Sequence, residues 1–212
     1  MNSLLKLVPI ILTTTGLSYS PSLSATTILG MDIDQVANDA ELVFEGEVLL
    51  RESQRDSNSG IISTYVTFSI FDVIKGSYDA TTIELKFAGG SIGDEIVEIN
   101  GLVMPEDGEQ GIYFVESINR NLINPLIGWS QGHFVVREEN GGRVVYTVDG
   151  RPVRDIQSVS SIPVTIKKLP SVVRSDSDVA TGVLVDDNQD RTIALEPLLV
   201  EELKSTILEM IE

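Results

Sequence analysis

The chain has 212 residues, of which 42% are hydrophobic, and its formal net charge is -17 at pH 7. Its length suits one or two compact domains with a core of their own. An acidic surface repels phosphate backbones and anionic lipids, so nucleic acid is not expected as a partner. The absence of cysteine excludes disulfides, thiolate nucleophiles and cysteine-ligated zinc.

Residues 1–25 have the pattern of a secretory signal peptide. Lys6 precedes an apolar run over residues 7–17, and small residues follow it up to Ala25. The run is shorter than the roughly 20 apolar residues that a membrane-spanning helix needs. We therefore expect a periplasmic or extracellular protein, cleaved after Ser24 or Ala25, with no membrane attachment once the signal is removed.

A short helix is expected near the start of the mature chain, over residues 32–39. Asp32 can cap its N-terminus, and Gln35 three residues later has the spacing of a capping box. Ile33 and Val36 would lie on its buried side.

Residues 41–87 predict the sheet around which the rest of the chain is organised. The alternation of apolar and polar residues is clearest over residues 82–87. Gly46 interrupts the first strand, which is typical of a β-bulge. We expect a polar loop over residues 51–60, and strands over residues 42–50, 64–74 and 82–87.

Further strand signals extend to residue 148. Single strands are expected over residues 92–99 and 111–117, and a hairpin is expected to turn at Asn140-Gly141-Gly142. Glycine-rich composition and short apolar runs favour β over α structure. We therefore expect a mainly β fold, an OB-like β-barrel over residues 26–153, with a short N-terminal helix and a C-terminal amphipathic helix.

The last part of the chain divides into two segments. Residues 154–195 have weak periodicity and are expected to form an irregular or β extension, or a linker. Pro197 can open a helix at its first turn, which places the amphipathic helix in residues 196–212. Its apolar side is expected to consist of Leu199, Leu203, Ile207 and Met210.

The single histidine, His133, limits the catalytic arrangements that are available. A zinc site made of histidines needs several imidazoles, and no serine lies in a Gly-x-Ser-x-Gly turn. A hydrolase that uses acidic residues together with His133 remains an alternative function. The expected role of His133 is a structural or surface one.

The segment Gly128-Trp129-Ser130-Gln131-Gly132 gathers aromatic and polar residues between glycines, directly before His133. Binding residues often lie on loops of this kind. We therefore name Trp129, Gln131 and His133 as candidate contact residues for a ligand or partner. The competing interpretation is that the glycines serve the turn and Trp129 fills the core.

Asp186, Asn188 and Asp190 have the spacing of the first three ligands of a calcium loop. An EF-hand would need glycine and glutamate where this chain has Arg191 and Pro197, so that motif fails. A weaker calcium contact through the three residues is a candidate metal site and would make the chain a calcium-dependent binding module. A turn rich in Asp and Asn is the alternative.

Three short segments resemble the opening of netrin-like and TIMP-like domains, which are OB-fold barrels. They are residues 40–48, 65–68 and 73–76, and Gly111–Val115 looks like a later strand of the same pattern. The resemblance spans roughly residues 39–115. TIMP-like inhibitors chelate the zinc of a protease through an N-terminal cysteine, which this chain lacks, so that mechanism cannot transfer.

The chain also resembles uncharacterised exported bacterial proteins that share a Val-x-x-Gly-x-Val start and a Gly-Trp-x-Gln-Gly segment, here residues 128–132. Some of those proteins accompany secreted metalloproteases. With no catalytic constellation in the sequence, we expect a non-enzymatic interaction module without a cofactor, whose partner is a protein such as a secreted protease.

Overall fold

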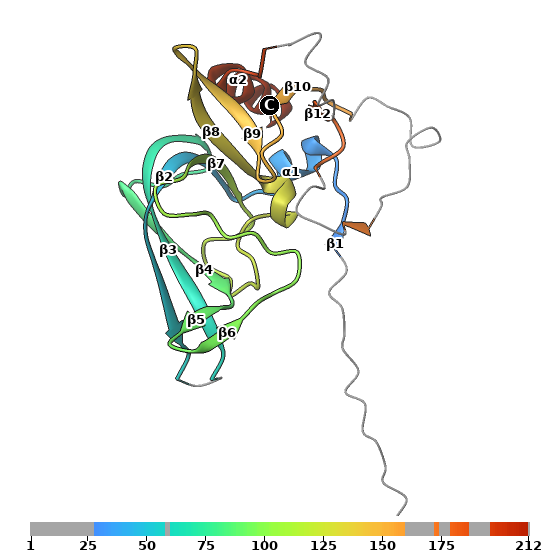
Figure 1. The fold of residues 1–212 in the computed structure, drawn as a ribbon. Coiled ribbons are helices and arrows are strands. Elements are labelled where there is room, and N and C mark those ends of the chain that lie inside the picture. The colour runs from blue at the N-terminus through green and yellow to red at the C-terminus, as the bar shows by residue number, and fades with distance from the viewer. Residues whose placement is uncertain (1–27, 58–59, 160–171, 174–178, 187–195, 212) are drawn as a thin grey trace, which may run out of the picture.

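The computed structural model describes residues 28–57, 60–159, 172–173, 179–186 and 196–211 (Figure 1). Of these residues, 48% lie in strands and 15% in helices, which confirms the expected mainly β fold with one helix near each end. Among these residues no helix is both long and apolar enough to cross a membrane.

A six-stranded antiparallel sheet forms the centre of the fold (Figure 1). It consists of two three-stranded meanders that meet where β2 pairs with β7. Within the described part of the chain its end strands, β4 and β9, do not pair with each other, so the curled, barrel-like sheet is open along that side. The strands lie in the order β4 (Thr82–Ala88), β3 (Ile62–Lys75), β2 (Leu42–Arg55), β7 (Gln110–Val115), β8 (His133–Glu139) and β9 (Gly142–Thr147).

Strands β2 and β3 are longer than the sequence pattern indicated. The expected polar loop over residues 51–60 is wrong over its first half, because residues 51–55 pair one by one with residues 62–66. The bulge expected at Gly46 is confirmed by a register shift between Glu45 and Gly46. A Cβ on Gly46 would lie 2.3 Å from the carbonyl oxygen of Ser69, so only glycine fits there.

Three small two-stranded sheets surround the central one. The single strand expected over residues 92–99 is confirmed only for residues 95–97, because Gly93 (φ 59°) turns the chain between two strands of a hairpin. The described parts of residues 154–195 include short strands and irregular segments, and Asn188 and Asp190 lie outside the described residues. The small sheets pair β5 (Gly90–Ile92) with β6 (Glu95–Val97), β10 (Val153–Ile156) with β12 (Val183–Val185), and β1 (Ile28–Leu29) with β11 (Val172–Val173).

Helix α1 (Ile33–Asp39) confirms the expected N-terminal helix, but its capping differs. The side chain of Asp32 makes no capping hydrogen bond, although Asp32 occupies the cap position and its carbonyl accepts from Val36 N–H at 3.0 Å. The helix is held by docking instead. Asn38 donates a side-chain hydrogen bond to the carbonyl of Met210 in the C-terminal helix at 3.1 Å.

Helix α2 (Val200–Ile211) begins later than the start expected at Pro197. Leu198 N–H donates to the carbonyl of Val153 at 2.8 Å, and its own carbonyl accepts from Val145 N–H at 3.0 Å. Because these bonds hold the preceding residues against β9 and β10, the helix cannot begin before them. Leu199 is therefore 43% exposed, and Val200 takes its expected place in the buried stripe beside Leu203.

The core lies on both faces of β7. Ile112 and Phe114 pack toward the two helices, whereas Tyr113 and Val115 point into the curl of the sheet. Such strict alternation is what a strand buried on both faces requires. One hydrophobic core therefore lies on each face of β7, and the residues that follow β7 in the chain pack against these two cores.

Candidate functional site

The turn that carries Trp129 has an unusual backbone. Gly128 and Trp129 both adopt left-handed dihedrals, with φ of 60° and 61°, immediately before and at the start of the 3-10 helix η1 (Trp129–Gly132). For a non-glycine residue this conformation costs about 1–2 kcal/mol. Strain of this kind persists only where the surrounding structure enforces it, and it clusters at functional sites.

Gln131 is the residue that enforces the turn. Its side-chain oxygen accepts from Met31 N–H at 2.7 Å, and its amide group donates to the carbonyls of Leu29 at 3.2 Å and Gly128 at 3.0 Å. The side chain is only 1% exposed. The structure therefore places this candidate contact residue inside the protein, where it ties η1 to the segment around β1.

Trp129 itself forms part of the wall of an open groove of about 750 Å³, which we call the Trp129 groove. The side chain is half-buried, and Leu29 on the same groove is 55% exposed. Arg120 and Glu116, which form an ion pair, and Asp39 supply its charged groups. The apolar part of the lining comes from Ile28, Leu29, Met31, Ile127 and Trp129.

His133 lies apart from this groove, in the interior of the curled sheet. It is 1% exposed, and its Nε2 lies 2.7 Å from Glu109 Oε1. The hydroxyl of Tyr113 donates to the same carboxylate and to the carbonyl of Glu109, both at 3.3 Å. Burial, with Glu109 beside the ring, raises the pKa of Tyr113 above its usual range. The three side chains hold the start of β8 against the turn that precedes β7.

This position bears on the hydrolase alternative. A general base must reach the proton that it removes, directly or through one water. The Nδ1 atom of His133 is buried and has no hydrogen-bond partner among the described residues, while Nε2 contacts Glu109. In this conformation no substrate can reach either ring nitrogen, so the geometry suits a structural role.

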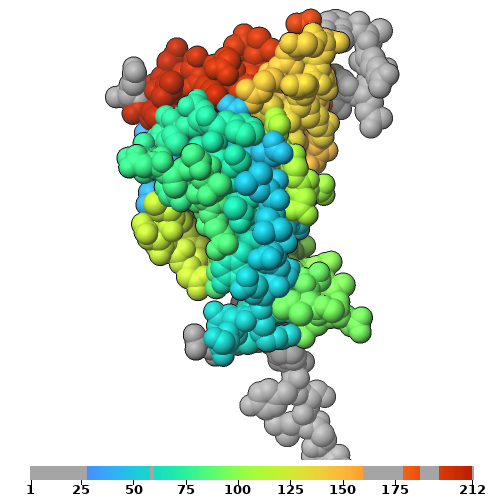
Figure 2. All heavy atoms as spheres, turned by 90° about the vertical axis from the view of Figure 1, so that its left-hand side faces the viewer, coloured from blue at the N-terminus to red at the C-terminus, as the bar shows by residue number. Residues whose placement is uncertain are grey.

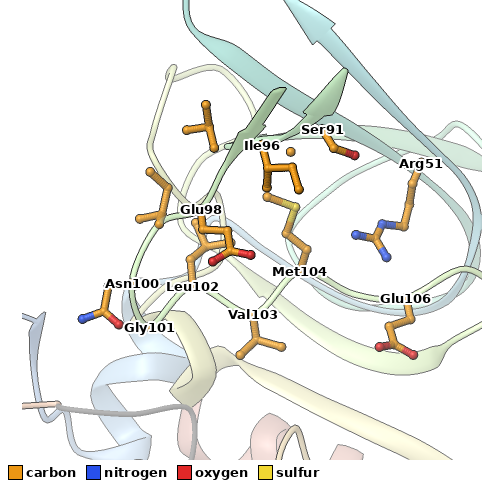
Figure 3. A pocket seen from close by; sticks show the side chains of 13 residues that line it. Arg51, Ser91, Ile96, Glu98, Asn100, Gly101, Leu102, Val103, Met104 and Glu106 are labelled. Atoms are coloured by element: carbon orange, nitrogen blue, oxygen red, sulfur yellow. The ribbon is translucent and has the colours of Figure 1, made fainter. Parts of the chain in front are cut away.

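A second hollow of about 590 Å³ lies between β2, the β5–β6 hairpin and the loop that follows it (Figure 3). We call it the Arg51 cleft, because Figure 3 shows the guanidinium group of Arg51 extending into it. Glu98 and Glu106 also line it, together with apolar residues such as Ile96 and Met104. The cleft and the Trp129 groove are neighbours, since a Cβ on Gly101 in the cleft would lie 3.9 Å from the ring of Trp129.

The candidate calcium ligands can be followed only in part. Asp186 forms an ion pair with Arg154 at 2.7 Å. Within the described ranges, no group of three or more His, Asp or Glu side chains is arranged to hold a metal ion. Calcium binding through Asp186, Asn188 and Asp190 therefore stays a prediction.

A buried ion cluster joins the sheet to helix α2. Glu45 on β2 is almost fully buried and pairs with both Arg143 on β9 and Lys204 on α2. Lys204 also lies 3.0 Å from Asp72 on β3. The cluster fixes how the helix sits on the sheet, and it lines neither the Trp129 groove nor the Arg51 cleft.

No protein-family model, curated protein or solved structure matches the chain, so inference about its function rests on its own residues. Sequence reasoning found Trp129 from its glycine-flanked segment but missed Leu29 and Met31. These two lie about a hundred residues away in the chain, and no local signal in the sequence connects them with the tryptophan.

Proposed function

We propose that this chain is an exported, non-enzymatic binding module that captures another protein through the Trp129 groove. The observation that carries the proposal is the position of Trp129. A large aromatic side chain lies partly exposed on a strained backbone, and the buried side chain of Gln131 holds that backbone in place.

The composition of the groove supports a polypeptide ligand. Tryptophan in a concave, mostly apolar setting is the residue type most often found at energetic hot spots of protein interfaces. Leu29 offers exposed apolar area beside it, while Glu116 and Arg120 form a polar rim. An apolar side chain of the partner would pack on the ring of Trp129.

The charge of the chain further limits the class of partner that can bind. With a net charge of -17, the module attracts basic surfaces and repels acidic ones during encounter. Asp39 adds a carboxylate to the groove. We therefore propose a partner outside the cytoplasm that presents an apolar side chain next to basic residues, and a secreted protease is the class of partner that the sequence resemblance suggests.

The proposal is tested by capture of exported proteins on the immobilised chain without its expected signal segment. The Trp129→Ala variant is compared with Phe71→Ala, which removes an aromatic ring that is 50% exposed on β3, away from the groove. We expect a partner that the wild type and Phe71→Ala retain and Trp129→Ala loses. Equal retention by all three proteins, or capture of no partner by any of them, contradicts the proposal.

If the captured partner is a protease, its peptide-hydrolysis rate is measured with and without the chain. A change in rate that Trp129→Ala abolishes would identify the chain as a regulator, and an unchanged rate would identify it as a carrier. Either outcome refines the proposed binding role.

A further inference from the structure

Over its second half, strand β2 pairs with a neighbouring strand on one side and, in the part of the chain that the structure describes, has no strand on the other. Its pairing with β7 ends at Glu47 and Gln110, whereas its pairing with β3 continues as far as Arg55. The chain leaves β2 at this point because residues 106–109 form a turn, closed by a hydrogen bond of 3.0 Å from Glu109 N–H to the carbonyl of Glu106. Among the described residues, no other strand takes the place beside residues 51–55.

The register shows which backbone groups the open edge presents. In β3, Ile70 N–H donates to Thr81 and the Ile62 carbonyl accepts from Gly89, so the even-numbered residues of β3 face β4. The odd-numbered residues of β3 therefore face β2, where they meet residues 50, 52 and 54. It follows that the N–H and carbonyl groups of Arg51 and Ser53 point away from β3, toward the open edge.

This edge borders the Arg51 cleft. Figure 2 shows the β5–β6 hairpin, in green, projecting beside the blue surface of β2, and Ser91 N–H on that hairpin donates to Ser53 Oγ at 3.3 Å. Arg51 lines the cleft, and its buried Nε has no hydrogen-bond partner among the described residues. The guanidinium group of Arg51 extends into the cleft (Figure 3), where its terminal N–H groups can donate to a carbonyl oxygen of an occupant that lies along the edge.

Apart from Arg51, the charged residues on the walls of the cleft are acidic. Residues 90–109, which form the hairpin and the loop, contain six acidic residues and no lysine or arginine. Two of them, Glu98 and Glu106, line the cleft together with Ile96, which is exposed, and Met104. This combination suits a ligand whose side chains alternate between apolar and basic.

We propose that the open edge of β2 at Arg51 and Ser53 binds an extended, basic segment of another protein as an added β-strand. Main-chain hydrogen bonds to the two residues supply the affinity, and the apolar wall and acidic rim of the cleft select alternating apolar and basic side chains. The guanidinium group of Arg51 donates to a carbonyl of the added strand. This site is separate from the packing surface on Trp129 and does not depend on the proposed use of the groove.

The test uses the full chain without its signal segment and a short synthetic peptide that alternates valine and lysine. Amide hydrogen exchange is followed residue by residue, with and without the peptide. In the free protein we expect Arg51 and Ser53 to exchange fast, whereas Glu52 and Gln54 are protected by β3. At saturation, exchange at Arg51 and Ser53 should slow by roughly tenfold or more, with Glu52 and Gln54 little changed.

Two altered peptides and two variants serve as controls. A peptide with glutamate in place of lysine, and a lysine peptide N-methylated at alternate amides, should both bind at least about tenfold more weakly. Arg51→Ala should weaken binding of the lysine peptide by about tenfold. Glu52→Ala, on the opposite face of the same strand, should keep wild-type affinity and unfolding midpoint.

Three results would overturn the proposal. One is binding of the lysine peptide without slower exchange at Arg51 and Ser53. Another is equal binding of the N-methylated peptide. The third is slow exchange of both amides in the free protein, which would mean that the edge is already covered.

Discussion

The side-chain oxygen of Gln131 accepts a hydrogen bond from the backbone N–H of Met31 at 2.7 Å, although the two residues are 100 positions apart. This bond joins the helix η1 to the segment that continues β1. The Trp129 groove lies between these two parts of the chain. The groove therefore depends on one buried amide that belongs to neither of the two hydrophobic core clusters.

Replacing Gln131 by leucine should lower the free energy of unfolding by about 2–3 kcal/mol, because Met31 N–H and the Leu29 carbonyl lose this buried partner and the Gly128 carbonyl keeps only the backbone N–H of residue 131. Urea denaturation measures the change. Gln157→Leu is the control, since the exposed amide of Gln157 bonds to the neighbouring Asp155. A loss below about 0.5 kcal/mol for Gln131→Leu would mean that Gln131 does not hold the turn.

Trp129→Gly should be more stable than Trp129→Ala by about 1 kcal/mol. Both variants lose the indole ring, but only glycine adopts the φ of 61° without a steric cost. Comparing the two variants in urea isolates the backbone contribution from the loss of the ring. If alanine is equally or more stable at this position, the left-handed backbone of Trp129 is not strained.

Tyr113→Phe should reduce the loss of stability at alkaline pH. An unfolded tyrosine loses its proton near pH 10, whereas burial raises the pKa of Tyr113 in the folded state. Its contribution to stability is therefore complete below about pH 10, and above it the free energy of unfolding falls by up to about 1.4 kcal/mol per pH unit.

Urea titrations between pH 8 and about pH 11 measure the slope with pH in the wild type and in Tyr113→Phe. Tyr146, whose pKa is also raised by burial and by its hydrogen bond to Glu139, keeps part of the slope in the variant. Tyr65→Phe, at a partly exposed ring, is the control. An unchanged slope in Tyr113→Phe would contradict the raised pKa.

Glu45→Ala should destabilise the protein by about 3 kcal/mol, since it leaves Arg143 and Lys204 without their buried partner. Lys204→Ala should cost less, because Glu45 keeps Arg143. A double-mutant cycle between Glu45 and Lys204, measured in urea, should give a coupling energy of about 1–3 kcal/mol. Additive effects would mean that the ion pair does not fasten α2 to the sheet.

Much of the central sheet could be predicted because its signals are local. Period-two alternation identified β4, and the glycine inside β2 identified its bulge. Asn140 and Gly141, with φ of 50° and 81°, form the turn of the expected β8–β9 hairpin. In each case, neighbouring residues decide the backbone conformation.

The predictions were wrong where contacts between residues far apart in the sequence decide the backbone conformation. Residues 51–55 are polar, and their composition predicted a loop, but pairing with β3 keeps them in a strand. Helix α2 begins at Val200 because Leu198 is held by backbone bonds to β9 and β10. Glu109, the partner of His133, could not be identified in the sequence among 32 acidic residues.

Trp129 is the only tryptophan in the chain, so emission at selective excitation reports on the surroundings of this one ring, which forms part of the groove wall. The most direct test titrates the captured partner against the wild type while emission at selective excitation is recorded. We predict a saturable shift of the emission maximum that gives the same dissociation constant as calorimetry and that Phe71→Ala retains. Full binding by calorimetry with an unchanged tryptophan emission, or wild-type affinity in Trp129→Ala, would contradict a binding role for the groove.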